Sequence, residues 1–127
     1  YNGWRRERKE LERLMSDGAL AIATFNTDIL DERVRNSDPS KIKDYTLMGM
    51  PVITTRALSS YLEIEKFKCG IVIDYDAKDL AIAVIKLLSY EQLLKKYRRN
   101  ALKFIKQFDC VKVFNENVSR ILDDGKK

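Results

Sequence analysis

Two charged side chains in the segment "SDPSKIKDYTLMGMPVITT", residues 37–55, could bind an anionic ligand. Pro39 and Ser40 predict a helix start at Ser40, where free backbone N–H groups and the positive end of the helix dipole form an anion site. Lys41 adds a positive charge there, and Asp44, about one turn further along, could accept hydrogen bonds from two sugar hydroxyls. Together these groups fit the diphosphate and the ribose of a nucleotide. The plainer alternative is that Ser40 only caps its helix and that Asp44 is solvated.

Other kinds of chemistry are excluded by the cysteine and histidine content. Cys69 and Cys110 are far apart in the chain, and there is no histidine. A Cys/His zinc site, a Cys-His nucleophile pair and a Ser-His-Asp triad therefore cannot be built from this chain alone. We expect neither a metal nor a cofactor. We interpret the two isolated cysteines as reduced, buried thiols of a cytoplasmic protein.

The composition is typical of one globular domain. The 127 residues are 45% hydrophobic and 34% charged, which suits one modest core. No apolar run approaches the roughly 20 residues of a membrane-spanning helix. The opening "YNGWRRERKE" lacks the apolar core of a signal peptide and begins without Met. We therefore expect a piece of a longer protein or a processed chain.

Basic residues give the chain a formal charge of +5, and many lie in the stretches "WRRERKELER" and "LLKKYRRNALKFIKQ". Both stretches contain apolar residues at helical spacing, which predicts two amphipathic helices with solvated basic faces. Binding to an anionic membrane surface or to nucleic acid are the sharper alternatives. We expect no nucleic acid as a partner, because no aromatic-basic platform is present. Peripheral membrane association stays open.

Helical and strand-like stretches alternate along the chain. Apolar residues at helical spacing, with Gly as a terminator, predict the helices, and short β-branched or apolar runs predict the strands. Residues 26–38 are polar and predict a loop with room for one short helical turn. The predicted helices are 5–16, 41–48, 59–66, 77–88, 90–107 and 111–122, and the predicted strands are 19–25, 52–55 and 71–75.

This alternation predicts an α/β fold, a Rossmann-like parallel sheet with flanking helices. Three strands are visible, whereas a doubly wound domain has about five or six. The opening Tyr1-Asn2-Gly3 resembles the tail of another strand. We therefore interpret residues 1–127 as a single, partial Rossmann-like domain, equivalent to the second half of a complete one. An unpaired strand edge predicts self-association of such a piece.

The segment "PSKIKDYTLMGMPVITT" resembles the "P-x-K-x-x-E-Y-x-x-x-G-x-P-V-I" signature in the C-terminal domain of GT-B-fold retaining glycosyltransferases. Three other stretches resemble further passages of that domain: "YNGWRRERKELERLMSDGALAIATF", "YLEIEKFKCGIVID" and "RRNALKFIKQFDCVKVFNENVSRIL". Their order and spacing carry the resemblance over nearly the whole chain. It implies a domain that binds a nucleoside-diphosphate sugar for transfer to an acceptor glycan or lipid.

The resemblance also implies roles for individual residues. Asp44 falls where the family places the acidic residue that binds the donor ribose, and residues 39–41 fall in the stretch whose backbone approaches the diphosphate. Gly3 and Trp4 fall near the loop that borders the nucleobase. Glu63 occupies a common family position to which we assign no role. The family's acceptor site lies mainly in the N-terminal domain, so we expect this chain alone to be inactive.

Three departures from the family pattern bear on the donor sugar. Asn36 stands where many members carry a first Glu that contacts the sugar, and the acidic Asp38 nearby is out of place. Asp44 is one methylene shorter than the usual Glu, and "ALSSYLE" replaces a Gly-rich turn. Two alternatives therefore stay open: a catalytically inactive glycosyltransferase-like scaffold, and a regulatory α/β domain of flavodoxin or receiver type. The second requires an acidic cluster near its first strand, and "IDYD" at residues 73–76 is too weak a match to stand for that cluster.

Overall fold

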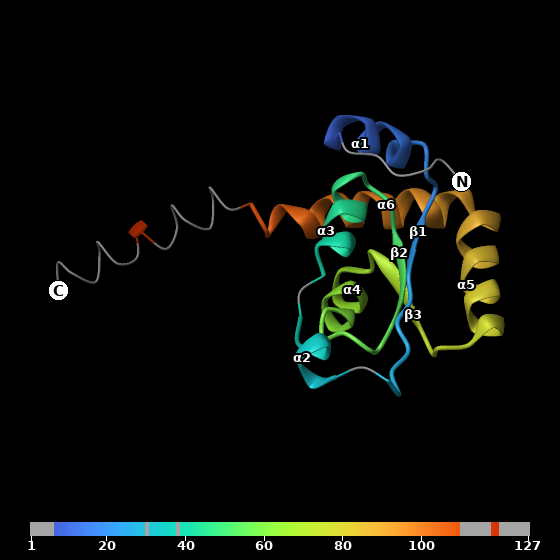
Figure 1. Ribbon diagram of the computed structural model, residues 1–127. Helices are drawn as coiled ribbons and strands as arrows, with labels where there is room; N and C mark the ends of the chain where they lie inside the picture. Colours follow the sequence, from blue (N-terminus) through green and yellow to red (C-terminus); the bar gives the residue numbers. More distant parts are fainter. Residues whose placement is uncertain (1–6, 30, 38, 110–117, 120–127) are drawn as a thin grey trace.

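A three-stranded parallel sheet with helices on both faces organises the chain (Figure 1). The computed structural model describes residues 7–29, 31–37, 39–109 and 118–119. Their elements are α1 (Arg8–Ser16), β1 (Ala21–Ala23), α2 (Glu32–Arg35), α3 (Ser40–Leu47), β2 (Val52–Thr55), α4 (Tyr61–Phe67), β3 (Gly70–Ile73), α5 (Ala77–Ser89) and α6 (Glu91–Lys106). The α/β class and the three predicted parallel strands are confirmed.

The strands lie side by side in chain order, β1-β2-β3. Ala21 pairs with Val52, which pairs in turn with Gly70. The sequential order means that the crossovers through α3 and α4 each lead to the neighbouring strand, as they do within one half of a doubly wound sheet. β2 is buried on both faces along its whole length, which explains its continuous β-branched sequence "VITT".

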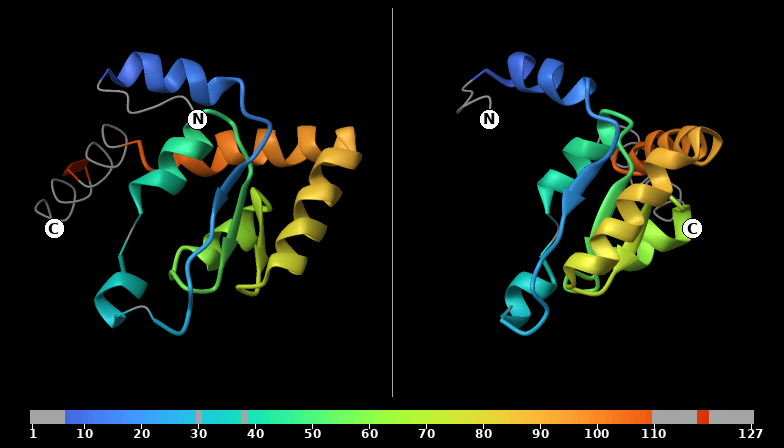
Figure 2. Two further views of the ribbon diagram at one scale, coloured as in Figure 1. Left: turned by 45° about the vertical axis from the view of Figure 1, so that its right-hand side comes forward. Right: turned by 90° about the vertical axis from the view of Figure 1, so that its right-hand side faces the viewer.

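The two faces of the sheet carry different helices (Figure 2). On one face Ile42 of α3, Ile64 of α4 and Phe104 of α6 pack against Ala21 and Val52. On the other face the buried Ala83 and Leu87 of α5 pack with Ile53 and Ile73. Helix α6 spans both clusters: residues 93, 94 and 97 near its beginning pack beside α5, and its later residues 101 and 104 pack beside α3 and α4.

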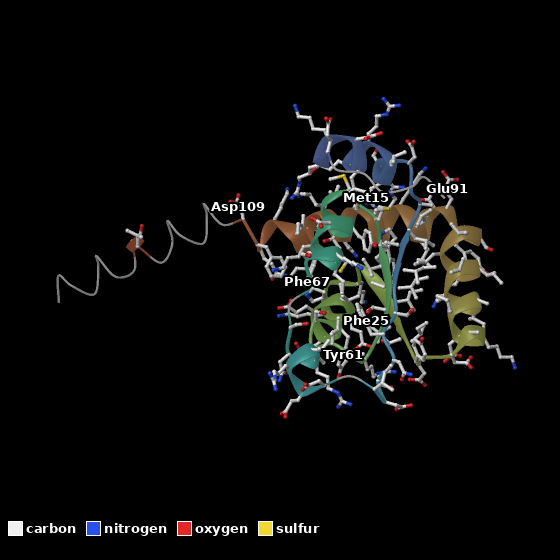
Figure 3. All side chains as sticks on the ribbon, viewed as in Figure 1. Met15, Phe25, Tyr61, Phe67, Glu91 and Asp109 are labelled. Atoms are coloured by element: carbon white, nitrogen blue, oxygen red, sulfur yellow. The ribbon has the colours of Figure 1, made fainter. Side chains whose placement is uncertain are left out.

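An aromatic cluster joins α4 to the end of α6. The rings of Phe67 and Phe108 each lie edge-on to Phe104, with centroid distances of 5.5 and 5.2 Å. Phe67 and Met15 are labelled in Figure 3, and both pack against the cluster that contains Phe104. This packing fixes α3 and α4 relative to α6. It therefore also fixes the loops that follow β1 and β2 at the carboxyl end of the sheet.

Local signals account for most element boundaries. Gly49, with a φ of 70°, follows the end of α3, and its N–H donates to the Thr46 carbonyl. Asp76 caps α5 by accepting hydrogen bonds from the N–H groups of Lys78 and Asp79. The short turn expected within residues 26–38 is α2, whose N-cap residue Asp31 accepts a hydrogen bond from the N–H group of Arg33. The predicted helix 111–122 lies outside the described residues, apart from 118–119, which are helical.

Candidate functional site

Helix α3 begins where the chain returns from the carboxyl end of β1. Pro39 occupies the N-cap position and Ser40 is the first helical residue, so Ser40 is not the cap that the plainer alternative expects, whereas Asp44 is partly exposed, as that alternative expects. Among the described residues, the first N–H group of this turn with a backbone partner is that of Ile42, which donates to the Pro39 carbonyl at 3.2 Å. The N–H groups of Ser40 and Lys41 lie at the open end of the helix, where an anion can accept from them.

The cations near this helix end differ in what they contact. The side chains of Ser40 and Lys41 are exposed. The Lys43 ammonium lies 4.3 Å from the centroid of the Phe108 ring, a cation–π contact. The exposed side chain of Lys41 can therefore move to contact a bound phosphate. Lys43, by contrast, also contributes to the packing of α3 against the end of α6.

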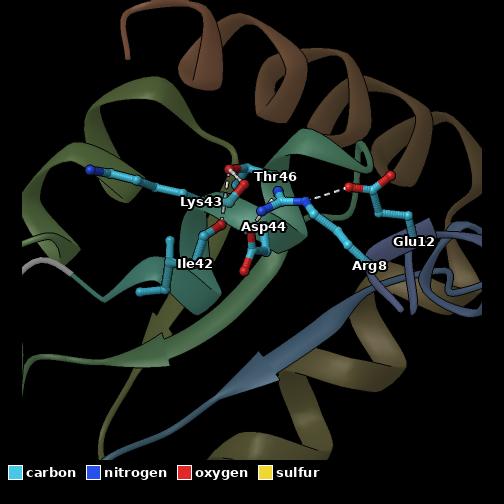
Figure 4. Close-up of polar contacts among 6 residues, drawn as sticks. All are labelled: Arg8, Glu12, Ile42, Lys43, Asp44 and Thr46. Atoms are coloured by element: carbon cyan, nitrogen blue, oxygen red, sulfur yellow. Dashed lines mark hydrogen bonds and ion pairs between the residues drawn. The ribbon is translucent and has the colours of Figure 1, made fainter. Parts of the chain in front are cut away.

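Asp44 lies one turn into α3 and faces α1 (Figure 4). Its Oδ1 accepts a hydrogen bond from Nη2 of Arg8 at 3.4 Å, and Nε of Arg8 donates to Glu12 at 2.7 Å. The hydrogen bond with Glu12, followed by the charge of Asp44, raises the pKa of Arg8 above its ordinary value. The Asp44 side chain is 45% exposed, so its second oxygen and its remaining lone pairs are open to a hydroxyl donor.

A cavity of about 250 Å³ lies between α1 and α3 beside Asp44. Half of its lining is charged and half is apolar: Glu7, Arg8, Glu12 and Asp44, with Leu11, Met15, Leu47 and Met48. Apolar walls next to a few convergent polar groups are typical of small-molecule sites. The methionine side chains are adaptable and can pack against a flat ring.

Asn36 lies outside α3, at the end of α2, beside a second cavity. It is the exposed C-cap of α2 and lines a cavity of about 380 Å³ with Ser37, Ser59, Ser60, Leu62, Glu63 and Phe108. The hydroxyl oxygen of Ser60 is buried and has no hydrogen-bond partner in the described part of the chain. Neutral hydroxyl and amide groups therefore dominate among the described lining residues, with the Glu63 carboxylate as the one acid among them.

The structure thus separates the predicted site residues into three groups. Residues 39–41 and Asp44 lie on one helix, Asn36 lies at the neighbouring cavity, and Gly3 and Trp4 lie outside the described residues. The sequence reasoning missed the contribution of α1. The available signal was the i,i+4 spacing of Arg8 and Glu12, which places a pair of opposite charges on one side of α1.

Three other sequence expectations concern metal ligands, the two cysteines and membrane-spanning helices. Among the described residues no cluster of three metal-ligating side chains occurs. Cys69 is a buried free thiol, as predicted, and burial raises its pKa to about 12; Cys110 lies outside the described part. None of the helices described is both long and apolar enough to span a membrane.

Comparisons with known proteins found no matching family model, no matching curated protein and no matching solved structure.

Proposed function

We propose that this chain is the C-terminal, donor-binding part of a GT-B-type glycosyltransferase, which binds a nucleoside-diphosphate sugar and transfers the sugar to an acceptor. One observation carries the proposal: the open end of α3 and the half-exposed carboxylate of Asp44 lie one helical turn apart, with a partly apolar cavity beside the carboxylate. That arrangement suits a diphosphate, a ribose and a base in this order.

In this proposal the diphosphate binds at the N-terminus of α3. The N–H groups of Ser40 and Lys41 donate to it, and the Lys41 ammonium neutralises part of its charge. Negative charge grows on the diphosphate as the glycosidic bond breaks, so the same groups stabilise the leaving group in the transition state. This role requires only positioned donors and a positive charge.

Asp44 would bind the ribose hydroxyls by accepting hydrogen bonds. Its contact with Arg8 is long, at 3.4 Å, and the Arg8 side chain is 69% exposed, and exposed ion pairs of this kind contribute little free energy. A ligand can therefore displace Arg8 at small cost. The cavity beside Asp44 would then take the base, with the side chains of Met15 and Met48 against its ring.

Titration calorimetry of this chain with UDP, GDP and ADP tests the proposal. We expect one nucleotide to bind, and Asp44→Ala to weaken that binding about 10- to 100-fold, as the loss of a hydrogen bond to a charged group implies. Asp17→Ala removes the same charge from an exposed position at the end of α1 and should leave binding unchanged. Equal, salt-sensitive binding of all three nucleotides, indifferent to Asp44, would contradict the proposal.

The inactive scaffold is the second candidate, and the position of Asn36 favours it. Position 36 carries a neutral amide in place of an acid, and Glu63 is the acid among the described residues that line the same cavity. Turnover by the full-length protein with a panel of sugar nucleotides separates the two candidates: the enzyme transfers a sugar, whereas a scaffold binds nucleotide without transfer.

No observation favours the flavodoxin or receiver alternative. Of the two acids in "IDYD", Asp74 accepts a hydrogen bond from Arg56 at 2.9 Å, and Asp76 caps α5. Both carboxylates therefore have structural partners.

A further inference from the structure

Helix α6 carries the whole net charge of the chain. It contains six basic residues and one acid, Glu91, an excess of five positive charges. The chain as a whole has a formal charge of +5, so the remaining 18 basic and 18 acidic residues cancel. The net charge of α6 is thus equal to the net charge of the whole chain.

Four of these cations form a row on the outer face of α6. Lys96, Arg99, Lys103 and Lys106 follow one another at intervals of three, four and three residues, which places them along one side of a helix. All four are exposed, and none forms an ion pair within the described part of the chain. They are called the basic row below. With a rise of about 1.5 Å per residue, the row is about 15 Å long.

The other two cations of α6 have partners. Nζ of Lys95 lies 2.6 Å from Oε1 of Glu91, and Nη1 of Arg98 donates to the Gly18 carbonyl at 3.4 Å. The acid of this helix is therefore already paired outside the basic row. Nothing on α6 neutralises the four cations of the row.

Lysines from two other elements widen the basic surface near Lys96. Lys68, which follows α4, and Lys86 of α5 line a cavity of about 420 Å³ together with Lys96. The acid that lines this cavity, Glu65, has its carboxylate 4.0 Å from the guanidinium of Arg56. The surface beside the row is thus also positive.

We propose that the basic row lies against an anionic phospholipid surface. Exposed basic side chains on one side of a helix are attracted to anionic headgroups, and Leu102, 45% exposed on the same helix, offers an apolar contact with the lipid interface. Single-stranded nucleic acid needs aromatic rings on which bases stack. Of the two aromatic residues of α6, Phe104 is buried in the core, and Tyr97 is half-buried, packs against the core and lines the cavity beside Lys96. This inference does not rest on the proposed function.

Vesicle co-sedimentation of the chain tests it. The probes are vesicles of phosphatidylcholine alone and of an equimolar mixture of phosphatidylcholine and phosphatidylserine. One variant replaces the four residues of the basic row by Gln. A control variant replaces the exposed Lys9, Arg13, Arg33 and Lys78 by Gln, so that both variants fall from +5 to +1. Circular dichroism checks that each variant is folded.

We expect the native chain to bind the mixed vesicles and not those of phosphatidylcholine alone. The basic-row variant should bind at least about tenfold more weakly, with the control variant within about twofold of the native chain. An equal loss in both variants would mean that net charge alone causes binding, and would overturn the proposal. Absence of binding to the mixed vesicles would overturn it too, as would tighter binding to a short single-stranded RNA at the same salt concentration.

Discussion

Replacing Gly70 by alanine tests the pairing of β2 with β3. Gly70 opens β3 opposite Val52. A Cβ atom at this position would lie 2.0 Å from the Val52 carbonyl oxygen and 2.8 Å from Cγ2 of Ile64. Side-chain carbons essentially never come closer than 3.0 Å to such atoms, so the strand must move by about 1 Å.

The cost of that movement follows from the contacts it disturbs. The hydrogen bond from the Val52 N–H to the Cys69 carbonyl, 3.2 Å long, would weaken, which costs about 0.5–1.5 kcal/mol. Ile64 is fully buried, and overpacking against it adds about 1–3 kcal/mol. We therefore expect Gly70→Ala to lower the free energy of unfolding by about 1.5–4.5 kcal/mol.

Urea unfolding followed by circular dichroism measures this loss, and Gly18→Ala is the matched control. A Cβ at Gly18 would meet Sδ of the buried Met50 at 2.6 Å and the Met15 carbonyl oxygen at 3.1 Å. The methionine side chain is flexible and can move aside, so we expect a loss below about 1 kcal/mol. Equal losses in the two variants, or a change below about 0.5 kcal/mol for Gly70→Ala, would refute the close approach of the two strands.

Two substitutions and one pH series of unfolding experiments test the packing of the core. Phe104→Ala removes a ring that is 1% exposed, and we expect urea unfolding to show a loss of about 3–5 kcal/mol; a loss below about 1 kcal/mol would contradict the aromatic packing. Thr54→Val removes a buried hydroxyl that donates to the Ala23 carbonyl at 2.8 Å, so we expect a loss of about 1–3 kcal/mol, and an unchanged midpoint would argue against that bond. Burial raises the pKa of Cys69 from 9.0 to about 12. Its contribution to stability is therefore fully present below pH 9.0 and is lost as the pH rises towards about 12, because the unfolded thiol ionises first. Urea unfolding across this range should show a steeper fall for the native chain than for Cys69→Ala, and parallel curves would contradict it.

The sequence predicted the sheet well, because its strands have local signals. "VITT" is an uninterrupted β-branched run and forms β2 at the predicted bounds, Val52–Thr55. Its two neighbours are shorter than predicted: β1 covers Ala21–Ala23 of the apolar run 19–25, and β3 ends at Ile73 rather than at residue 75. Strand length depends on the partner strand, and the four residues of β2 limit both neighbours.

The candidate site was harder to predict, because its geometry comes from contacts between distant segments. The bond between Arg8 and Asp44 joins residues 36 positions apart, and no local pattern encodes such a contact. Likewise, the cavity at Asn36 forms because α2 and the start of α4 lie close together, as the bond from the Ser59 N–H to the Arg35 carbonyl shows. The helix start at Ser40, by contrast, was readable from Pro39 and the residues that follow it.

The central claim is that a nucleoside diphosphate binds at the start of α3, and an NMR titration of the ¹⁵N-labelled chain tests it most directly. Backbone amide shifts would be followed as the nucleotide preferred in calorimetry is added. We expect the largest changes to fall on Ser40, Lys41 and Asp44, and to disappear in Asp44→Ala. Changes concentrated on the basic row of α6 and unaffected by that substitution would show electrostatic attraction of the phosphates alone, and would contradict the claim.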